Sequence, residues 1–136
     1  MRALAEAFVQ GAAEEGEAFG WESVEASRLD SLCGAFLNSR PSADVQHSMI
    51  MAMGAYLGEL MVRNGGGRWR YDSRHREAVV EMPNGLHGYP HTKVAKRLTV
   101  GPEHDLFQFY WYALTRDTPP GSQIRVLSDE DSGTSG

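Results

Sequence analysis

A periodic apolar pattern over residues 42–65, ended by three consecutive glycines, limits the folds open to this chain of 136 residues. Apolar side chains recur there at spacings of three and four, at Val45, Met49, Ala52, Met53, Tyr56, Leu57, Leu60 and Met61. This spacing predicts a helix of about 20 residues, roughly 30 Å long. Ser42 is suited to cap its N-terminus, and Gly65 to end it in the left-handed conformation. We expect this helix to be the spine of the fold, with Gly54 and Gly58 marking the close approach of another element.

The glycines at positions 65, 66 and 67 also raise the question of a phosphate-binding loop. Walker-type and dinucleotide-binding loops lie between a strand and the N-terminus of the following helix. Here the order is reversed, because the glycines close a helix and precede a segment with the alternation of a strand. The C-terminus of a helix carries partial negative charge, which repels phosphate. We therefore interpret the glycines as a helix cap and a hinge that lets Trp69 fold back onto the helix.

Signals for three short strands follow the glycines. Polar and aromatic residues alternate at 68–71, and a looser alternation covers 77–82. The Pro-Asn-Gly sequence at 83–85 is a turn signal, because asparagine and glycine tolerate the positive φ angles of tight hairpins. With residues 86–90 as the last strand, the pattern predicts a three-stranded antiparallel meander.

The remaining periodic segments are helical. Four further helices are predicted, at residues 2–15, 23–37, 93–98 and 103–114. Helices packed on a small three-stranded antiparallel β-meander make an α+β fold, which we expect to form a single domain over residues 1–116. Residues 117–136 begin with a breaker run and become acidic and rich in serine and glycine, which predicts a mobile C-terminal tail.

Charge is unevenly distributed along the chain, whose net charge is −5. Residues 1–39 hold two basic and seven acidic side chains, whereas residues 63–100 hold eight basic and three acidic ones. Either the acidic flanks fold back over the basic middle, or the middle offers a basic surface to an acidic partner or to nucleic acid. The overall acidity argues against strong binding to nucleic acid.

Composition argues against several classes of protein. Cys33 is the only cysteine, so neither an intramolecular disulfide nor a cysteine metal cluster can form. Its place in a helical apolar stripe predicts a buried, inert thiol. The N-terminal residues lack the pattern of a signal peptide, and no window has the roughly 18 apolar residues that span a bilayer. We therefore expect a cytoplasmic protein that does not enter a membrane.

Motifs for catalysis and metal binding are weak in this sequence. The five histidines form no His-Glu-x-x-His motif. His87, Tyr89 and His91 share one side if their segment is extended, and with Glu59 they define an alternative hypothesis. In that alternative the chain is a small enzyme or ligand-binding domain with a two-histidine, one-carboxylate metal site in the helix–sheet cleft. Because no catalytic constellation is complete, we expect no catalysis, no bound metal and no cofactor.

The order of short motifs in the middle of the chain resembles that of small uncharacterised bacterial domains. The motifs are Gly-Ala-Tyr-Leu-Gly-Glu, Gly-Gly-Arg-Trp, Tyr-Pro followed by Lys-Val-Ala-Lys-Arg-Leu, and Gly-Pro-Glu-His-Asp-Leu. In that family a long helix leads into a Gly-Arg-Trp strand, a hairpin and a Lys-rich helix. The resemblance covers residues 52–114 and implies an α+β fold without assigning catalytic residues. Some of these domains look like immunity or accessory proteins of bacterial toxin systems.

The leading functional hypothesis is a non-catalytic bacterial protein-binding module of an accessory, adaptor or immunity type. Its binding face is expected on the exposed side of the meander and on the helix at 93–98, with an unidentified protein partner. The expected contacts are basic and aromatic side chains: Arg68, Arg70, Tyr71, His87, His91, Lys93 and Arg97. A homodimer through Trp111 is a further alternative, because the last helix carries more aromatic side chains than one core face needs.

Overall fold

The computed structural model describes residues 1–119, and in this part of the chain five helices and three strands follow one another. The helices are α1 (Arg2–Glu14), α2 (Val24–Asn38), α3 (Ala43–Gly65), α4 (Pro90–Thr99) and α5 (Leu106–Thr115). The strands β1 (Arg68–Asp72), β2 (Glu77–Glu81) and β3 (His87–Gly88) form an antiparallel sheet in the order β1-β2-β3. The predicted α+β fold is confirmed.

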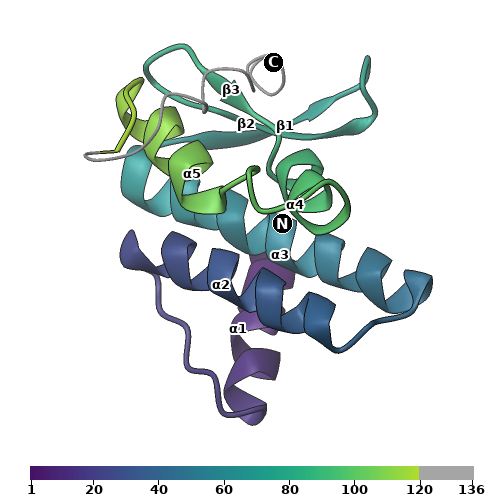
Figure 1. The fold of residues 1–136 in the computed structure, drawn as a ribbon. Helices are drawn as coiled ribbons and strands as arrows, with labels where there is room; N and C mark the ends of the chain where they lie inside the picture. Colours follow the sequence, from purple (N-terminus) through teal and green to yellow (C-terminus); the bar gives the residue numbers. More distant parts are fainter. Residues whose placement is uncertain (120–136) are drawn as a thin grey trace.

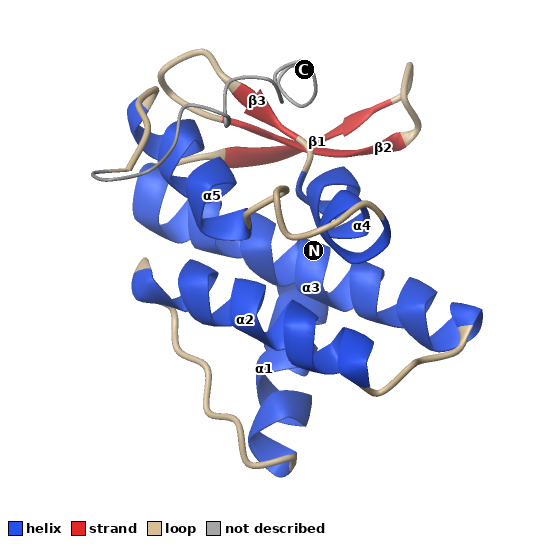
Figure 2. Cartoon of the chain, viewed as in Figure 1, coloured by secondary structure: helices blue, strands red, loops and turns tan. Residues whose placement is uncertain are grey.

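Helix α3 runs through the middle of the molecule and contacts each of the other described helices as well as the sheet (Figure 1). The strands form a layer on one side of α3, and α1 and α2 lie on the other side (Figure 2). Helices α4 and α5 pack against α3 between the sheet and α2. The expectation that this long helix is the spine of the fold is therefore confirmed.

Both ends of α3 are set by local chemistry. The Ser42 hydroxyl accepts a hydrogen bond from the Val45 amide at 3.2 Å, which satisfies one of the free N–H groups of the first turn. The helix ends at Gly65, and Gly66 adopts a left-handed φ of +75° while its amide donates to the Val62 carbonyl. The cap thus lies one residue later than predicted, and the glycines close the helix as expected.

Two glycines in the buried part of α3 let other elements rest directly on its backbone. A Cβ atom at Gly58 would lie 2.1 Å from Cη2 of Trp69 in β1. A Cβ atom at Gly54 would lie 2.3 Å from Cδ2 of His91 in α4. Both distances are far shorter than van der Waals contact, so a side chain at either position would clash with its neighbour. The predicted close approach at these glycines is confirmed, and it sets the positions of β1 and α4 on α3.

Aromatic contacts anchor α1 at the middle of α3. The ring centroid of Phe8 lies 4.9 Å from that of Tyr56, and Phe19, in the segment after α1, lies 5.6 Å from Tyr56. Aromatic pairs at these separations stabilise a core beyond the apolar area that they bury. The Tyr56 hydroxyl also donates to the Gly20 carbonyl, so its polar end has a partner.

The last strand and the last two helices have bounds that differ from those predicted. Strand β3 is shorter because Pro90 begins α4, where the missing N–H and fixed φ of proline suit a first helical turn. Helix α5 begins at Leu106 because Asp105 caps it by accepting from the Gln108 amide at 2.8 Å. The predicted mobile tail falls mostly on residues 120–136, which lie outside the described part of the chain.

Candidate functional site

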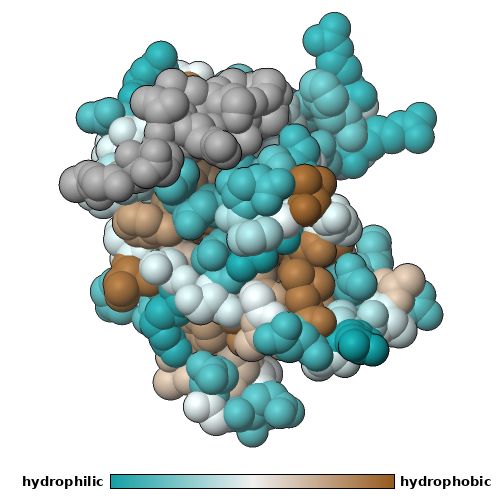
Figure 3. Space-filling view, viewed as in Figure 1, coloured by the Kyte–Doolittle hydropathy of each residue, from teal (hydrophilic) through white to brown (hydrophobic). Residues whose placement is uncertain are grey.

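The β1–β2 hairpin projects from the body of the molecule, and in Figure 3 it forms a hydrophilic extension at the upper right. Its turn is formed by residues 73–76. Asp72 organises this turn, because its Oδ1 accepts from the amides of Arg74 at 3.0 Å and His75 at 3.3 Å. Its Oδ2 accepts from the His75 ring at 2.7 Å and from the Tyr89 hydroxyl at 2.6 Å. The turn is thereby tied to the residue that precedes α4.

These hydrogen bonds shift the ionisation of Asp72 and Tyr89. The hydroxyl of Tyr89 and the ring of His75 hold the pKa of Asp72 well below its usual range, so the carboxylate stays ionised. Burial, together with the bond to Asp72, raises the pKa of Tyr89 to about 12. The turn is therefore held by an ionised Asp72 carboxylate that accepts a hydrogen bond from the neutral Tyr89 phenol.

Two arginines in the turn carry positive charge that no described carboxylate neutralises. Arg74 and Arg76 are exposed, and neither forms a salt bridge within residues 1–119. Arg76 also has a φ of +56°, a conformation that costs an L-residue about 1 kcal/mol and that glycine adopts freely. The neighbouring acidic groups already have partners, since Glu77 accepts from the Thr92 hydroxyl at 2.6 Å.

A second group of cations surrounds Glu81 on the same sheet. Arg70 donates from Nε to Glu81, while Arg68 Nη2 lies 3.7 Å and His87 Nε2 lies 3.9 Å from its carboxylate oxygens. The Arg70 hydrogen bond lowers the pKa of Glu81. Tyr71, next to Arg70 in β1, is 63% exposed. These four basic or aromatic residues, all predicted as contacts, therefore lie at the surface, where two guanidinium groups share one carboxylate.

Three other predicted contacts lie in the interior. His91, Lys93 and Arg97 are 9%, 4% and 7% exposed. Helix α4 packs on α3, α2 and α5, so side chains on several of its faces are covered. Lys93 Nζ is 3.2 Å from Nδ1 of His104, and Arg97 donates from Nε to Asp30 at 2.9 Å. The prediction that these three side chains are exposed on a binding face is therefore wrong.

Glu59 joins α3 to the sheet. It is 5% exposed, and its Oε1 accepts a hydrogen bond from Nε1 of Trp69 at 3.1 Å. Its Oε2 lies 3.5 Å from Nε of Arg63, one helical turn further along α3. Both carboxylate oxygens thus have partners within the fold, as a buried carboxylate requires. The arrangement gives Glu59 a role in holding Trp69 against the helix.

The residues of the hypothesised metal site are not brought together. His87 lies beside Glu81 at the sheet surface, whereas Tyr89 belongs to the turn cluster. His91 is buried, and its Nε2 lies 3.2 Å from the Met51 carbonyl oxygen. Within residues 1–119, no group of three or more His, Cys, Asp or Glu side chains could hold a metal ion. The two-histidine, one-carboxylate hypothesis is therefore wrong.

Cys33 is a buried thiol between α2 and α3, as predicted. Its Sγ lies 3.8 Å from Sδ of Met53, within the core. Burial raises the pKa of this thiol to about 12. Because the thiolate is the nucleophilic form, Cys33 is unreactive in the folded protein.

His91 gives the stability of the fold a testable pH dependence. Burial lowers the pKa of this imidazole from its ordinary value of 6.5. The unfolded chain therefore binds a proton that the folded chain does not, so this stabilisation is present above about pH 6.5 and lost below it. When the pH is lowered from about 7.5 to about 5.5, we expect the urea concentration at the unfolding midpoint to decrease. The decrease should be smaller in His91→Gln. Equal decreases in the two proteins would contradict this assignment.

Comparisons of the chain with protein-family models, with curated proteins and with solved structures find no match. Among the described helices, none combines the length and the apolar character that crossing a bilayer requires. The resemblance to small bacterial domains stays a prediction, and the described residues themselves carry the functional inference.

Proposed function

We propose that the chain is a non-catalytic protein-binding module whose β1–β2 hairpin and adjoining sheet surface bind an acidic segment of another protein. The observation that carries this proposal is the pair of exposed arginines, Arg74 and Arg76, without ionic partners in the described part of the chain. They stand on a turn that Asp72 holds in a fixed geometry. Guanidinium groups carried on a projecting turn of fixed backbone geometry suit the recognition of carboxylates.

The neighbouring sheet surface supports the same partner chemistry. Arg68, Arg70 and His87 share the single carboxylate of Glu81. Tyr71 adds an exposed aromatic side chain beside them. Arginine and tyrosine are enriched among the residues that dominate binding energy at protein interfaces. The net charge of −5 favours an acidic protein segment over nucleic acid, because long-range repulsion opposes a polyanion.

The alternative of a small enzyme in the helix–sheet cleft has no comparable support, since Glu59 is engaged by Trp69 and Arg63. The homodimer through Trp111 also stays a prediction. Accessory, adaptor and immunity-type roles are all compatible with a module that binds one acidic partner. Affinity purification followed by mass spectrometry would identify that partner.

The double variant Arg74→Ser/Arg76→Gly tests the proposal. We expect the amount of partner protein that co-purifies with the chain to fall about tenfold, since two charges at the rim of an interface are lost. Stability should stay the same or rise by up to about 1 kcal/mol, because glycine relieves the left-handed conformation at position 76. Quantitative mass spectrometry after affinity purification from the native cell measures recovery, and thermal unfolding measures stability.

Arg40→Gly provides the matched control. Arg40 is also an exposed arginine with a positive φ, of +53°, but it lies in the loop between α2 and α3. This variant should show a similar change in stability with full partner recovery. Equal recovery of the same proteins by the wild type and the hairpin variant would rule out the hairpin as the binding surface.

A further inference from the structure

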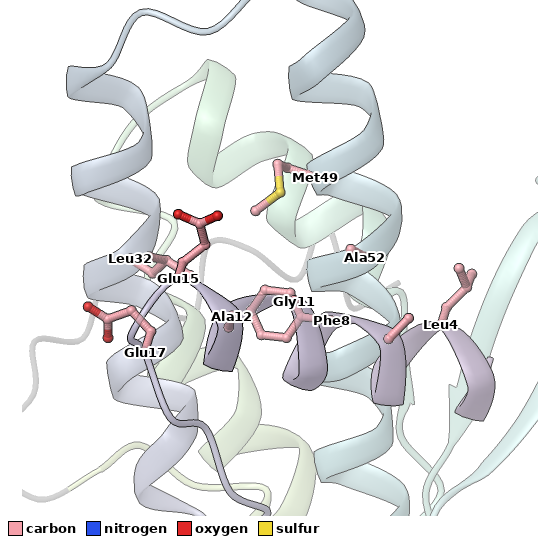
Figure 4. Close-up of a pocket in the computed structure, with 10 residues that line it drawn as sticks. Leu4, Phe8, Gly11, Ala12, Glu15, Glu17, Leu32, Met49 and Ala52 are labelled. Carbon is pink, nitrogen blue, oxygen red and sulfur yellow. The ribbon is translucent and has the colours of Figure 1, made fainter.

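Helices α1, α2 and α3 form an apolar groove on the side of α3 opposite the sheet. Its volume is about 380 Å³, and nearly all of its accessible lining is apolar. Figure 4 shows α1 crossing the other two helices, with side chains of all three directed to the same space. The lining includes Leu4, Phe8 and Gly11 from α1, Leu32 from α2, and Met49 and Ala52 from α3.

Gly11 is a glycine that the described fold does not need. A Cβ atom at this position would meet no atom within 4 Å. Its φ also lies outside the left-handed region, so the backbone there would accept any L-residue. Glycine in the middle of a helix lowers stability relative to alanine. Within residues 1–119, the space above Gly11 is therefore open to an occupant.

The apolar stripe of α3 also continues past the part that the described chain covers. Residues 53–61 of this helix are all buried. Val45, Met49 and Ala52 extend the stripe toward the N-terminus at spacings of four and three, yet Val45 is 47% exposed. Leu4, at the far end of the groove in α1, is 41% exposed. An apolar face thus extends across α1 and α3 without a covering element in the described residues.

Negative charge lies at one end of the groove. Glu15 and Glu17 line this end, and in Figure 4 their carboxylates lie next to α2. Glu15 forms no salt bridge within residues 1–119. Arg28 forms salt bridges with both Glu17 and Glu25: its Nη2 lies 3.5 Å from Oε1 of Glu17, and its Nη1 lies 2.6 Å from Oε1 of Glu25. This charge disfavours anionic amphiphiles and favours an occupant with a cation at that end.

The dimensions of the groove suit a helix. The lining along α1 extends from Leu4 to Glu15, the residue that caps the end of this helix, which is roughly 17 Å or three helical turns. The small residues Gly11 and Ala52 leave room for large side chains of an apposed helix, since helices pack by fitting side chains into such spaces. Laying an apolar helical face into a hydrophobic groove is a recurring mode of peptide recognition.

We propose that this groove binds an amphipathic helix of a partner protein, about three turns long, with large apolar side chains on one face and Lys or Arg beside Glu15 and Glu17. The site lies across α3 from the sheet, so it is separate from the basic hairpin (Figure 1). The two surfaces have opposite charge, and together they would let one chain hold an acidic segment and a basic helix at the same time.

A peptide-display experiment on the full chain tests this proposal. The probe is a library of helical peptides of about 14 residues, with leucine or phenylalanine along one face and Lys, Arg, Glu, Gln or Ser at the flanking positions. We expect the selected peptides to carry Lys or Arg at one end of the apolar face. Fluorescence anisotropy of the best peptide then gives its dissociation constant.

Variants of α1 connect this binding to the groove. Gly11→Leu should weaken binding of the selected peptide about tenfold or more by filling the groove. The fold should be retained, because a Cβ at position 11 meets no atom within 4 Å. Gln10→Leu is the matched control, since it adds the same side chain to an exposed neighbouring position outside the groove, and its affinity should equal that of the wild type. Glu15→Gln/Glu17→Gln should weaken binding about threefold and reduce its salt dependence.

Each other outcome overturns the proposal in a distinguishable way. Selection of acidic peptides, selection of none, or equal affinity for Gly11→Leu would exclude a basic helix in this groove. Binding of the neutral dye Nile red that Gly11→Leu abolishes, without peptide binding, would identify a small apolar ligand instead. Sedimentation showing a dimer that Gly11→Leu dissociates would identify a second copy of the chain. The hairpin variant Arg74→Ser/Arg76→Gly should leave peptide affinity unchanged, so the two proposals can fail separately.

Discussion

Replacing Arg97 with methionine is expected to lower the free energy of unfolding by about 3 kcal/mol. Arg97 and Asp30 form an ion pair with side chains 8% and 19% exposed, and Nε lies 2.9 Å from Oδ1. Methionine keeps much of the apolar stem but leaves the Asp30 carboxylate without its cation. Removing one partner of a buried pair costs roughly 3–5 kcal/mol, and the residual exposure of Asp30 places this case at the lower end.

The loss is large because Asp30 connects three helices. Its Oδ1 also accepts from the amide of Leu106, the first residue of α5, at 2.9 Å. Its backbone carbonyl accepts from Nη2 of Arg97 at 3.2 Å. Helices α2, α4 and α5 therefore meet at one acidic residue, and a disturbance there affects all three. Urea unfolding followed by far-UV circular dichroism measures the change.

Lys96→Met is the matched control for this substitution. Lys96 precedes Arg97 in α4 and forms no salt bridge within the described residues, so its loss should change stability by less than about 0.5 kcal/mol. Combining Arg97→Met with Asp30→Asn should recover part of the loss, because the neutral amide keeps an acceptor for the Leu106 amide. An Arg97→Met protein as stable as the Lys96 variant would show that the ion pair does not stabilise the fold.

The helices and the meander could be predicted because their signals are local. Ser42 caps α3 through an amide three residues away, and Gly66 ends that helix through its own φ angle. The last strand was predicted to reach Pro90, whereas Pro90 begins α4. The local sequence does not decide between the two, since proline permits both a strand end and a first helical turn. At Pro90 the helix forms, because α4 packs on α3 at Gly54, and that contact lies outside any sequence window.

The orientation of the basic residues in α4 could not be predicted in the same way. A lysine or arginine in a short helix is exposed in most proteins, which made Arg97 a reasonable surface candidate. Its partner Asp30 is 67 residues away in the sequence, so no local pattern indicates the buried ion pair. Arg68 and Arg70 were placed correctly because strand alternation alone separates them from Trp69, which packs inward.

The groove beside α1 depends on how far apart two helices lie, which sequence periodicity does not specify. In the sequence, Gly11 indicates only a position of low helix propensity in a segment rich in alanine and glutamate. The role of the hairpin turn could not be predicted from a local pattern either. Arg74 and Arg76 were counted in the basic middle of the chain, but their lack of ionic partners in the described residues follows only from the tertiary structure.

Adding one methyl group at Gly58 is expected to destabilise the fold by about 2 kcal/mol, although alanine favours a helix by roughly 1 kcal/mol over glycine. The new Cβ would lie 2.1 Å from Cη2 and 2.3 Å from Cζ2 of Trp69, and 3.1 Å from Cγ of Pro90. Trp69 cannot retreat freely, because its Nε1 donates to the buried Glu59 at 3.1 Å. Moving the ring would leave that carboxylate with an unsatisfied oxygen.

Gly11→Ala gives the comparison that isolates packing from helix propensity. Both substitutions exchange glycine for alanine inside a helix, but the Cβ at position 11 meets nothing within 4 Å. Gly11→Ala should therefore stabilise the protein by about 0.5–1 kcal/mol, opposite in sign to Gly58→Ala. In a Trp69→Phe background the smaller ring should remove much of the penalty at Gly58, giving a positive coupling in a double-mutant cycle. If Gly58→Ala is instead as stable as Gly11→Ala, then Trp69 does not pack against α3 at this position, and β1 is not fixed there.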